Sequence, residues 1–207
     1  MFNVCPECGQ YPDNKAIEPN GPFALCHYCG YRHRFKQLPL FVITGPSGIG
    51  KSTLCLELST RTSDYVIMET DILWNDEFTK GQDNYVTYHI MWLPVAKNIS
   101  QAGKPVILCG TALPEQHEQC AERRYFDKIH YLALVCEDET LANRLQNRPS
   151  WRRSGEKNFI DEMIPFNRWF KDNANRTKPP IELLDTTGRS IDCTTEQIIK
   201  WLDKHNH

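Results

Sequence analysis

The 207-residue sequence lacks several features that would define its class at once. It has no apolar run near the roughly 18 residues that a membrane-spanning helix needs. Residues 1–5 have neither the basic start nor the apolar stretch of a secretion signal. The formal net charge of −2 gives no overall attraction to nucleic acid or to membranes, and the chain contains no internal repeat. We therefore expect a soluble, cytoplasmic protein.

The composition is that of a folded protein. Hydrophobic residues make up 40% of the chain, which is enough to build a core. A length of 207 residues suits one domain of alternating strands and helices with a small addition. Four of the nine cysteines form two close pairs. Others, such as Cys109 and Cys136, stand in apolar runs, which indicates buried thiols in a reducing compartment.

The paired cysteines predict a metal site near the N-terminus. Cys5 and Cys8 form one C-x-x-C pair, Cys26 and Cys29 form the other, and seventeen residues separate the pairs. This spacing is typical of a structural Zn²⁺ site with four thiolate ligands. A redox-active C-x-x-C would need a βαβ setting, which is absent here. The pattern resembles zinc ribbons, and we expect residues 1–38 to form a domain whose folding depends on the metal.

Residues 31–36, just after the second pair, alternate basic and aromatic side chains. Such a segment can bind nucleic acid through its charges and rings. The same alternation is also typical of a strand with one solvated face, and this is the interpretation we favour.

A second motif, at residues 45–53, predicts a nucleotide site. It follows the apolar residues 40–44, which indicate a buried strand, and it leads into a predicted helix. The motif matches G-x-x-x-x-G-K-[ST] and reads Gly45, Pro46, Ser47, Gly48, Ile49, Gly50, Lys51, Ser52, Thr53. In this pattern the backbone N–H groups and the helix N-terminus bind phosphates. The lysine reaches the β- and γ-phosphates, and the Ser52 hydroxyl can bind Mg²⁺.

Two carboxylates follow the next predicted strand, residues 64–68. Because ligands of open parallel sheets bind at the carboxyl ends of the strands, we expect Glu69 and Asp71 to face the phosphate loop, although a surface turn would also explain them. The insertion that follows, residues 72–103, is rich in aromatic residues. Tyr85, Tyr88, Trp92, Val95 and Ile99 recur at helical spacing. They could form core or a pocket for a flat substrate, and we expect Pro94 to kink or divide the helix.

The remaining pattern predicts the fold. Three further apolar strands are predicted over residues 104–109, 130–136 and 181–185, the first of them ending in Gly110 and Thr111 without an aspartate. Helices are predicted over residues 115–124, 140–147 and 196–204. Five strands alternating with helices predict an α/β domain over residues 39–207. Its parallel sheet would carry helices on both faces.

Four arginines, Arg144, Arg148, Arg152 and Arg153, crowd into ten residues before another helix. Their charges would repel one another unless an anion lies among them, and guanidinium groups suit phosphates. A solvated basic face is the alternative.

Residues 39–205 resemble the P-loop small-molecule and nucleoside-monophosphate kinases, among them shikimate kinase, gluconate kinase and chloramphenicol phosphotransferase. The resemblance implies ATP and Mg²⁺ as cofactors. It also implies transfer of the γ-phosphate to a small acceptor, either a nucleoside or a nucleoside monophosphate.

The resemblance also implies roles for single residues. Glu69 would help to hold Mg²⁺, and Asp71 would orient or deprotonate the acceptor hydroxyl. Arg148 would contact ATP from a lid near residues 148–157. The residues expected to act in catalysis are Lys51, Asp71, Arg152 and Arg153.

Two other functions are alternatives to a small-molecule kinase. A GTPase would carry an N-K-x-D element, which is absent, and the D-x-x-G letters at residues 185–188 follow the last strand instead of the third. The second alternative is a nucleic-acid-end kinase or an RNA-binding NTPase whose zinc ribbon would grip the nucleic acid. The net charge of −2 does not favour this alternative, but the sequence does not exclude it. The sequence predicts no oligomeric state.

Overall fold

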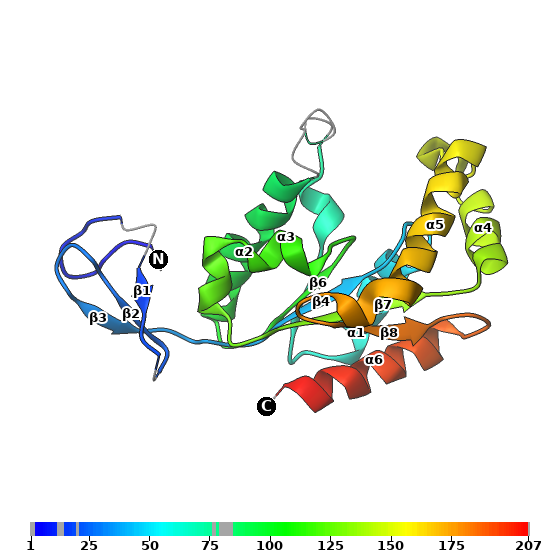
Figure 1. Cartoon of the computed structure of the whole chain (residues 1–207). Helices are drawn as coiled ribbons and strands as arrows, with labels where there is room; N and C mark the ends of the chain where they lie inside the picture. The colour runs from blue at the N-terminus through cyan, green and yellow to red at the C-terminus, as the bar shows by residue number, and fades with distance from the viewer. Residues whose placement is uncertain (1–2, 12–14, 20, 76–77, 79–84, 207) are drawn as a thin grey trace.

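The computed structural model describes residues 3–11, 15–19, 21–75, 78 and 85–206. Two separate sheets form within this part of the chain (Figure 1). The first is a small antiparallel sheet near the N-terminus, built from β1 (Ala16–Ile17), β2 (Phe23–Leu25) and β3 (Arg32–Arg34). It projects from one end of the larger body, to which residues 35–39 connect it.

The second sheet has five strands, all parallel, in the order β5-β6-β4-β7-β8. In chain order the strands are β4 (Leu40–Thr44), β5 (Val66–Glu69), β6 (Val106–Cys109), β7 (Ile129–Val135) and β8 (Ile181–Asp185). The central strand β4 is buried on both faces: Leu40 and Val42 belong to one core cluster, whereas Phe41 and Ile43 belong to the other. The predicted fold class is thus confirmed.

Helices cover both faces of this sheet (Figure 1). They are α1 (Lys51–Arg61), α2 (Val86–Ser100), α3 (Pro114–Glu118), α4 (Asp138–Gln146), α5 (Lys157–Asn173) and α6 (Ile191–His205). Residues of α2 and Phe170 of α5 pack into the cluster on one face. Residues of α1, α4 and α6 pack into the cluster on the other. Four short 3₁₀ turns complete the described elements: η1 (Thr70–Leu73), η3 (Ala121–Tyr125), η4 (Ser150–Arg152) and η5 (Ala174–Arg176).

Two helices differ from their prediction. The charged segment predicted as one helix over residues 115–124 is α3 followed by η3, because Cys120 adopts an extended backbone that ends the helical run. The division that we gave as one effect of Pro94 is also absent: α2 runs unbroken from Val86 to Ser100. There the Asn98 side-chain amide donates to the Pro94 carbonyl at 2.8 Å.

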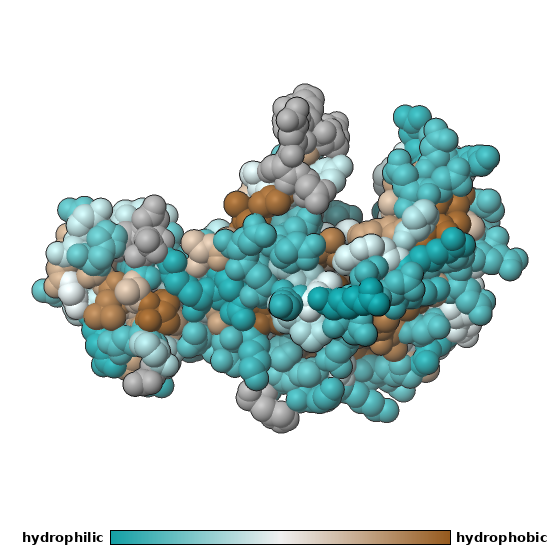
Figure 2. Space-filling model, viewed as in Figure 1, coloured by the Kyte–Doolittle hydropathy of each residue, from teal (hydrophilic) through white to brown (hydrophobic). Residues whose placement is uncertain are grey.

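The surface is mostly hydrophilic (Figure 2). Hydrophobic side chains show beside the hollow between the lobe of α2 and the lobe of α4 and α5. Among the described residues, no helix combines the length and the apolar character needed to cross a membrane.

Candidate active site and metal centre

The phosphate loop joins β4 to α1 and lines an open space of about 200 Å³. Gly50 caps the N-terminus of α1 with φ of 112°, a left-handed conformation that favours glycine. Gly45 has φ of 135°, and a Cβ atom there would lie 2.5 Å from the Leu134 carbonyl oxygen. The space is lined by Ser47, Gly48, Gly50, Lys51, Ser52, Thr53, Asp71 and Arg148. The loop therefore lines this cavity with glycine backbone and polar side chains.

Lys51 lies folded over this loop. Its Nζ donates to the carbonyl oxygens of Gly45 at 2.7 Å and Pro46 at 2.9 Å. Desolvation lowers the pKa of Lys51 to about 8, and the nearby Asp71 carboxylate opposes that shift. The ammonium group is thus held at the loop by neutral acceptors, which an anionic phosphate could replace.

Two oxygen-bearing side chains meet at the start of α1. The Ser52 hydroxyl donates to Oε1 of Glu69, the last residue of β5. A hydroxyl beside a carboxylate is an oxygen donor set that suits Mg²⁺. Glu69 is thus close enough to Ser52 for both to hold one ion.

Asp71 follows in η1 and is exposed to the cavity of the phosphate loop. This turn packs tightly against the end of β6: a Cβ atom added at Gly110 would meet Thr70 Oγ1 at 1.7 Å. Thr111 donates from Oγ1 to the Gly45 carbonyl at 3.0 Å. The strand ends therefore place Asp71 and Thr111 beside the loop. For Asp71, this is the position that the parallel sheet predicted.

A second cavity, of about 470 Å³, adjoins the first and has aromatic walls. Its lining residues are Ser47, Lys51, Asp71, Trp74, Tyr85, Tyr88, His89, Thr111 and Phe159. The Trp74 ring lies 5.6 Å from the Tyr85 ring and 5.2 Å from the Tyr88 ring. Tyr88 is 4% exposed, and its hydroxyl is buried without a hydrogen-bond partner among the described residues.

The aromatic stripe of α2 is divided between the core and the wall of this cavity. Trp92 packs in the core, with Val95 and Ile99 against it, while Tyr88 borders core and cavity. Tyr85 stands at the cavity with φ of 61°, an uncommon left-handed conformation for an aromatic residue. Residues 76, 77 and 79–84 of the same insertion lie outside the described residues.

The four arginines do not form one cluster. Arg148 donates to Ser47 Oγ at 3.1 Å and lines the phosphate-loop cavity. Desolvation, followed by the charge of Arg152, lowers the pKa of Arg148. Arg152 lies over the Trp151 ring at 4.8 Å. Both belong to the predicted lid segment, and their expected roles stay predictions.

Arg153 and Arg144 are engaged elsewhere. Arg153 Nε donates to Glu156 at 2.6 Å on the surface, with its side chain 78% exposed. Arg144 donates to Thr186 Oγ1 and to the Thr186 carbonyl, both at 3.0 Å. Arg144 therefore joins α4 to the loop after β8.

A third cavity, of about 270 Å³, lies on the other side of the phosphate loop. Arg144, Thr186 and Arg189 line it together with the loop glycines. We did not predict Thr186 and Arg189 as site residues, although their position after the last parallel strand was a signal for it. Phe159 of α5, in the second cavity, was also missed, because it stands in a helix far along the chain.

The four paired cysteines come together at one point. Their Sγ atoms all lie within 4.8 Å of one another. Cys5 Sγ is 3.7 Å from Cys29 Sγ, and Cys8 Sγ is 3.8 Å from Cys26 Sγ. Tetrahedral Zn²⁺ with Zn–S bonds of about 2.3 Å separates its sulfurs by about 3.8 Å. The cluster therefore has the size that a Zn²⁺ ion requires.

A buried lysine next to this cluster fits the same interpretation. Lys15 is 1% exposed, with Nζ 3.2 Å from His33 Nε2. Desolvation lowers the pKa of Lys15, whereas the cysteine thiolates favour its charge. Four thiolates around one Zn²⁺ carry a net charge of −2, which a buried cation would partly offset.

Residues 31–36 combine side chains that contact the rest of the protein with side chains that are exposed. Arg32 pairs with Glu18 at 2.7 Å and lies over the Phe23 ring at 3.5 Å. Phe35 is buried and packs edge-on against Tyr125 at 5.7 Å. This arrangement agrees with a strand that has one solvated face.

The parallel sheet, the phosphate loop leading into a helix and the carboxylates at the neighbouring strand end define a P-loop domain with the fold of the small-molecule kinases. The chain belongs to the family described as AAA domain, which it matches over residues 42–164. No curated protein matches the sequence.

Solved structures share this fold at low sequence identity. A sugar kinase from Janibacter sp. HTCC2649 has a TM-score of 0.61 and 15% identity, covering 81% of this chain and 95% of that one. A gluconokinase from Sinorhizobium meliloti 1021 has a TM-score of 0.55 and 16% identity, covering 83% and 100%. The tunicamycin resistance protein of Deinococcus radiodurans has a TM-score of 0.55 and 15% identity, covering 81% and 96%.

Proposed function

We propose that this protein is an ATP- and Mg²⁺-dependent kinase that transfers the γ-phosphate to a nucleoside or nucleoside monophosphate. One observation carries the proposal. Ser47, Lys51 and Asp71 line both the phosphate-loop cavity and the aromatic cavity. Two cavities that share these side chains suit a reaction between a bound triphosphate and a second molecule, and the fold supports it.

The proposed step is an in-line displacement at the γ-phosphorus. An acceptor oxygen forms the new P–O bond, the bond to the oxygen bridging the β- and γ-phosphates breaks, and ADP leaves. Where the acceptor is a hydroxyl, its proton passes to the Asp71 carboxylate. Lys51 and Arg148 stabilise the negative charge on the phosphoryl group. Mg²⁺, held by Ser52 and Glu69, would neutralise the phosphate oxygens.

The walls of the second cavity support a flat acceptor. Trp74, Tyr85 and Phe159 offer aromatic faces on which a base can stack. The Tyr88 ring borders the same cavity. The third cavity, between the loop and Arg189, is the proposed place of the ATP base.

A screen for acceptor-dependent ADP formation tests the proposal. Nucleosides, nucleoside monophosphates and gluconate are each added to protein, ATP and Mg²⁺, and the rate without acceptor is subtracted. We expect at least one nucleoside or nucleoside monophosphate to raise ADP formation well above that rate, and gluconate to leave it unchanged. ADP formation that no acceptor stimulates would refute the proposal.

A further inference from the structure

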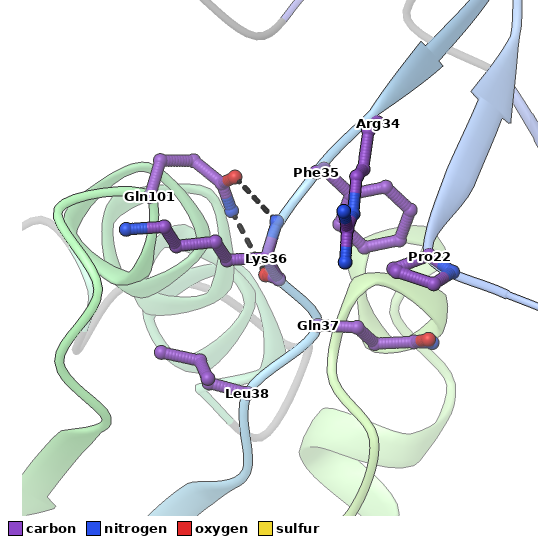
Figure 3. A pocket seen from close by; sticks show the side chains of 7 residues that line it. All are labelled: Pro22, Arg34, Phe35, Lys36, Gln37, Leu38 and Gln101. Atoms are coloured by element: carbon purple, nitrogen blue, oxygen red, sulfur yellow. Dashed lines mark hydrogen bonds between the residues drawn. The ribbon is translucent and has the colours of Figure 1, made fainter.

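The C-terminal end of α2 is fastened to the segment that connects the two sheets. The side-chain amide of Gln101 accepts from the Lys36 N–H at 2.9 Å and donates to the Lys36 carbonyl at 3.1 Å (Figure 3). The same amide donates to the Lys97 carbonyl at 3.2 Å. The Gln101 side chain thus forms hydrogen bonds with both the N–H and the carbonyl of Lys36, as the backbone of a neighbouring strand would.

Lys97, one turn earlier on α2, makes a second connection. It is 2% exposed, and its Nζ donates to Asn3 Oδ1 at 2.9 Å. The same Nζ lies 3.9 Å from Glu122 and 4.7 Å above the Tyr125 ring. Asn3 stands two residues before the first cysteine of the metal cluster. A buried ammonium with these partners holds its helix in place, because moving away from a partner would leave a buried charge without compensation.

The other end of α2 forms a wall of the aromatic cavity. Tyr85, Tyr88 and His89 belong to its first turn and to the residue that caps it. The 15 residues of α2 span about 22 Å at 1.5 Å per residue. Since α2 is continuous across Pro94, a shift at its C-terminal end reaches its N-terminal end.

We propose that Gln101 and Lys97 are positioning residues. They hold α2 in place against the connecting segment and against Asn3, close in sequence to the cysteine cluster, and they thereby set the distance between the tyrosine wall and Asp71. The inference rests on the proposed function, because it takes the aromatic cavity as the acceptor site. It gives the N-terminal region, through Asn3 and Lys36, a role in acceptor binding that requires no contact between that region and the acceptor.

The test uses the full chain with Zn²⁺ bound and the substitution Gln101→Glu. This change keeps the acceptor for the Lys36 N–H but sets a carboxylate against the Lys36 carbonyl. We expect the KM of the phosphate acceptor to rise about fivefold or more, a typical coupling between sites, with the KM of ATP unchanged. Gln37→Glu is the matched control: Gln37 donates across the same junction to the Arg124 carbonyl at 3.3 Å and makes no hydrogen bond to α2 among the described residues. It should leave both constants unchanged.

Hydrogen exchange provides a readout that does not depend on activity. The amides of residues 86–93 should exchange faster in Gln101→Glu than in the wild type or in Gln37→Glu. Asn3→Ala, a milder change at the second connection, should shift exchange in the same direction. Unchanged exchange in Gln101→Glu and Asn3→Ala, or equal rises in the KM of ATP and acceptor, would overturn the inference. If the wild type transfers no phosphate, the proposed function fails, and exchange alone decides the positioning role.

Discussion

Replacing Asp71 with asparagine removes the proposed general base while keeping its shape. Asp71 is exposed at the start of η1 and borders both cavities, so the substitution should leave the core intact. A general base contributes a factor of about 10² to 10⁴ in rate. At 1.36 kcal/mol for each factor of ten, kcat should fall by an amount equal to about 3 to 5 kcal/mol of barrier.

A side effect of this substitution must be separated from the chemistry. The Asp71 carboxylate favours the charged forms of Lys51 and Arg148. Its removal therefore lowers the pKa of Lys51 below about 8 and weakens the cation at the phosphate loop. Comparing kcat at pH 6.5, well below the wild-type Lys51 pKa of about 8, reduces this side effect and leaves mainly the loss of the base.

The assay follows acceptor-dependent ADP formation at saturating ATP and acceptor, with ATP affinity measured separately by titration. Glu69→Gln serves as a comparison, because it should raise the Mg²⁺ concentration needed for half-maximal rate. A fall of less than about threefold in kcat for Asp71→Asn lies far below the range for a general base. Such a result would refute the role of Asp71 as a base and leave it a positioning group.

Other perturbations test separate parts of the site. Burial lowers the pKa of Lys51 to about 8, so ATP affinity of the free enzyme should weaken as the pH rises through 8. Lys51→Arg, whose guanidinium stays charged, should bind ATP without that pH dependence. If the ATP affinity of both proteins fell equally with rising pH, the loss would not come from Lys51. Cys8→Ser should lower the zinc content below the one ion per chain expected for the wild type. A metal-free wild type, or one with a disulfide at these cysteines, would exclude the zinc site. Arg148→Ala and Arg152→Ala should reduce phosphate transfer about tenfold or more without a change in melting temperature, as expected for charges that act on the transferred group. Arg153→Ala should have an equal effect only if, in the wild type, the ion pair between Arg153 and Glu156 opens when ATP binds. Unchanged phosphate transfer in this variant would show that Arg153 does not act in catalysis.

Local patterns were sufficient to predict the centre of the fold. Residues 40–53 combine an apolar run with a glycine-rich loop, and both signals lie next to each other in the chain. Glu69 and Asp71 could be predicted to approach the loop because parallel strands end at one edge of a sheet. The four cysteines could be grouped because C-x-x-C spacing is itself a geometric constraint.

Contacts between distant segments could not be predicted in this way. The pairing of Gln101 with Lys36 joins residues 65 positions apart, and neither residue type implies the other. Phe159 reaches the aromatic cavity from α5, far along the chain from the other residues that line it. Arg153 was grouped with its neighbours by charge, but the closest carboxylate, Glu156 one turn later, engages it instead.

Phosphorus NMR of one reaction tests the central claim most directly. The full chain is incubated with ATP, Mg²⁺ and a nucleoside that stimulates ADP formation, and the phosphorus signals are followed with time. A kinase predicts that the γ-phosphate signal declines while a phosphate monoester signal of the acceptor grows equally, and that neither change occurs in Lys51→Ala. Growth of inorganic phosphate alone would identify an NTP hydrolase and contradict the account.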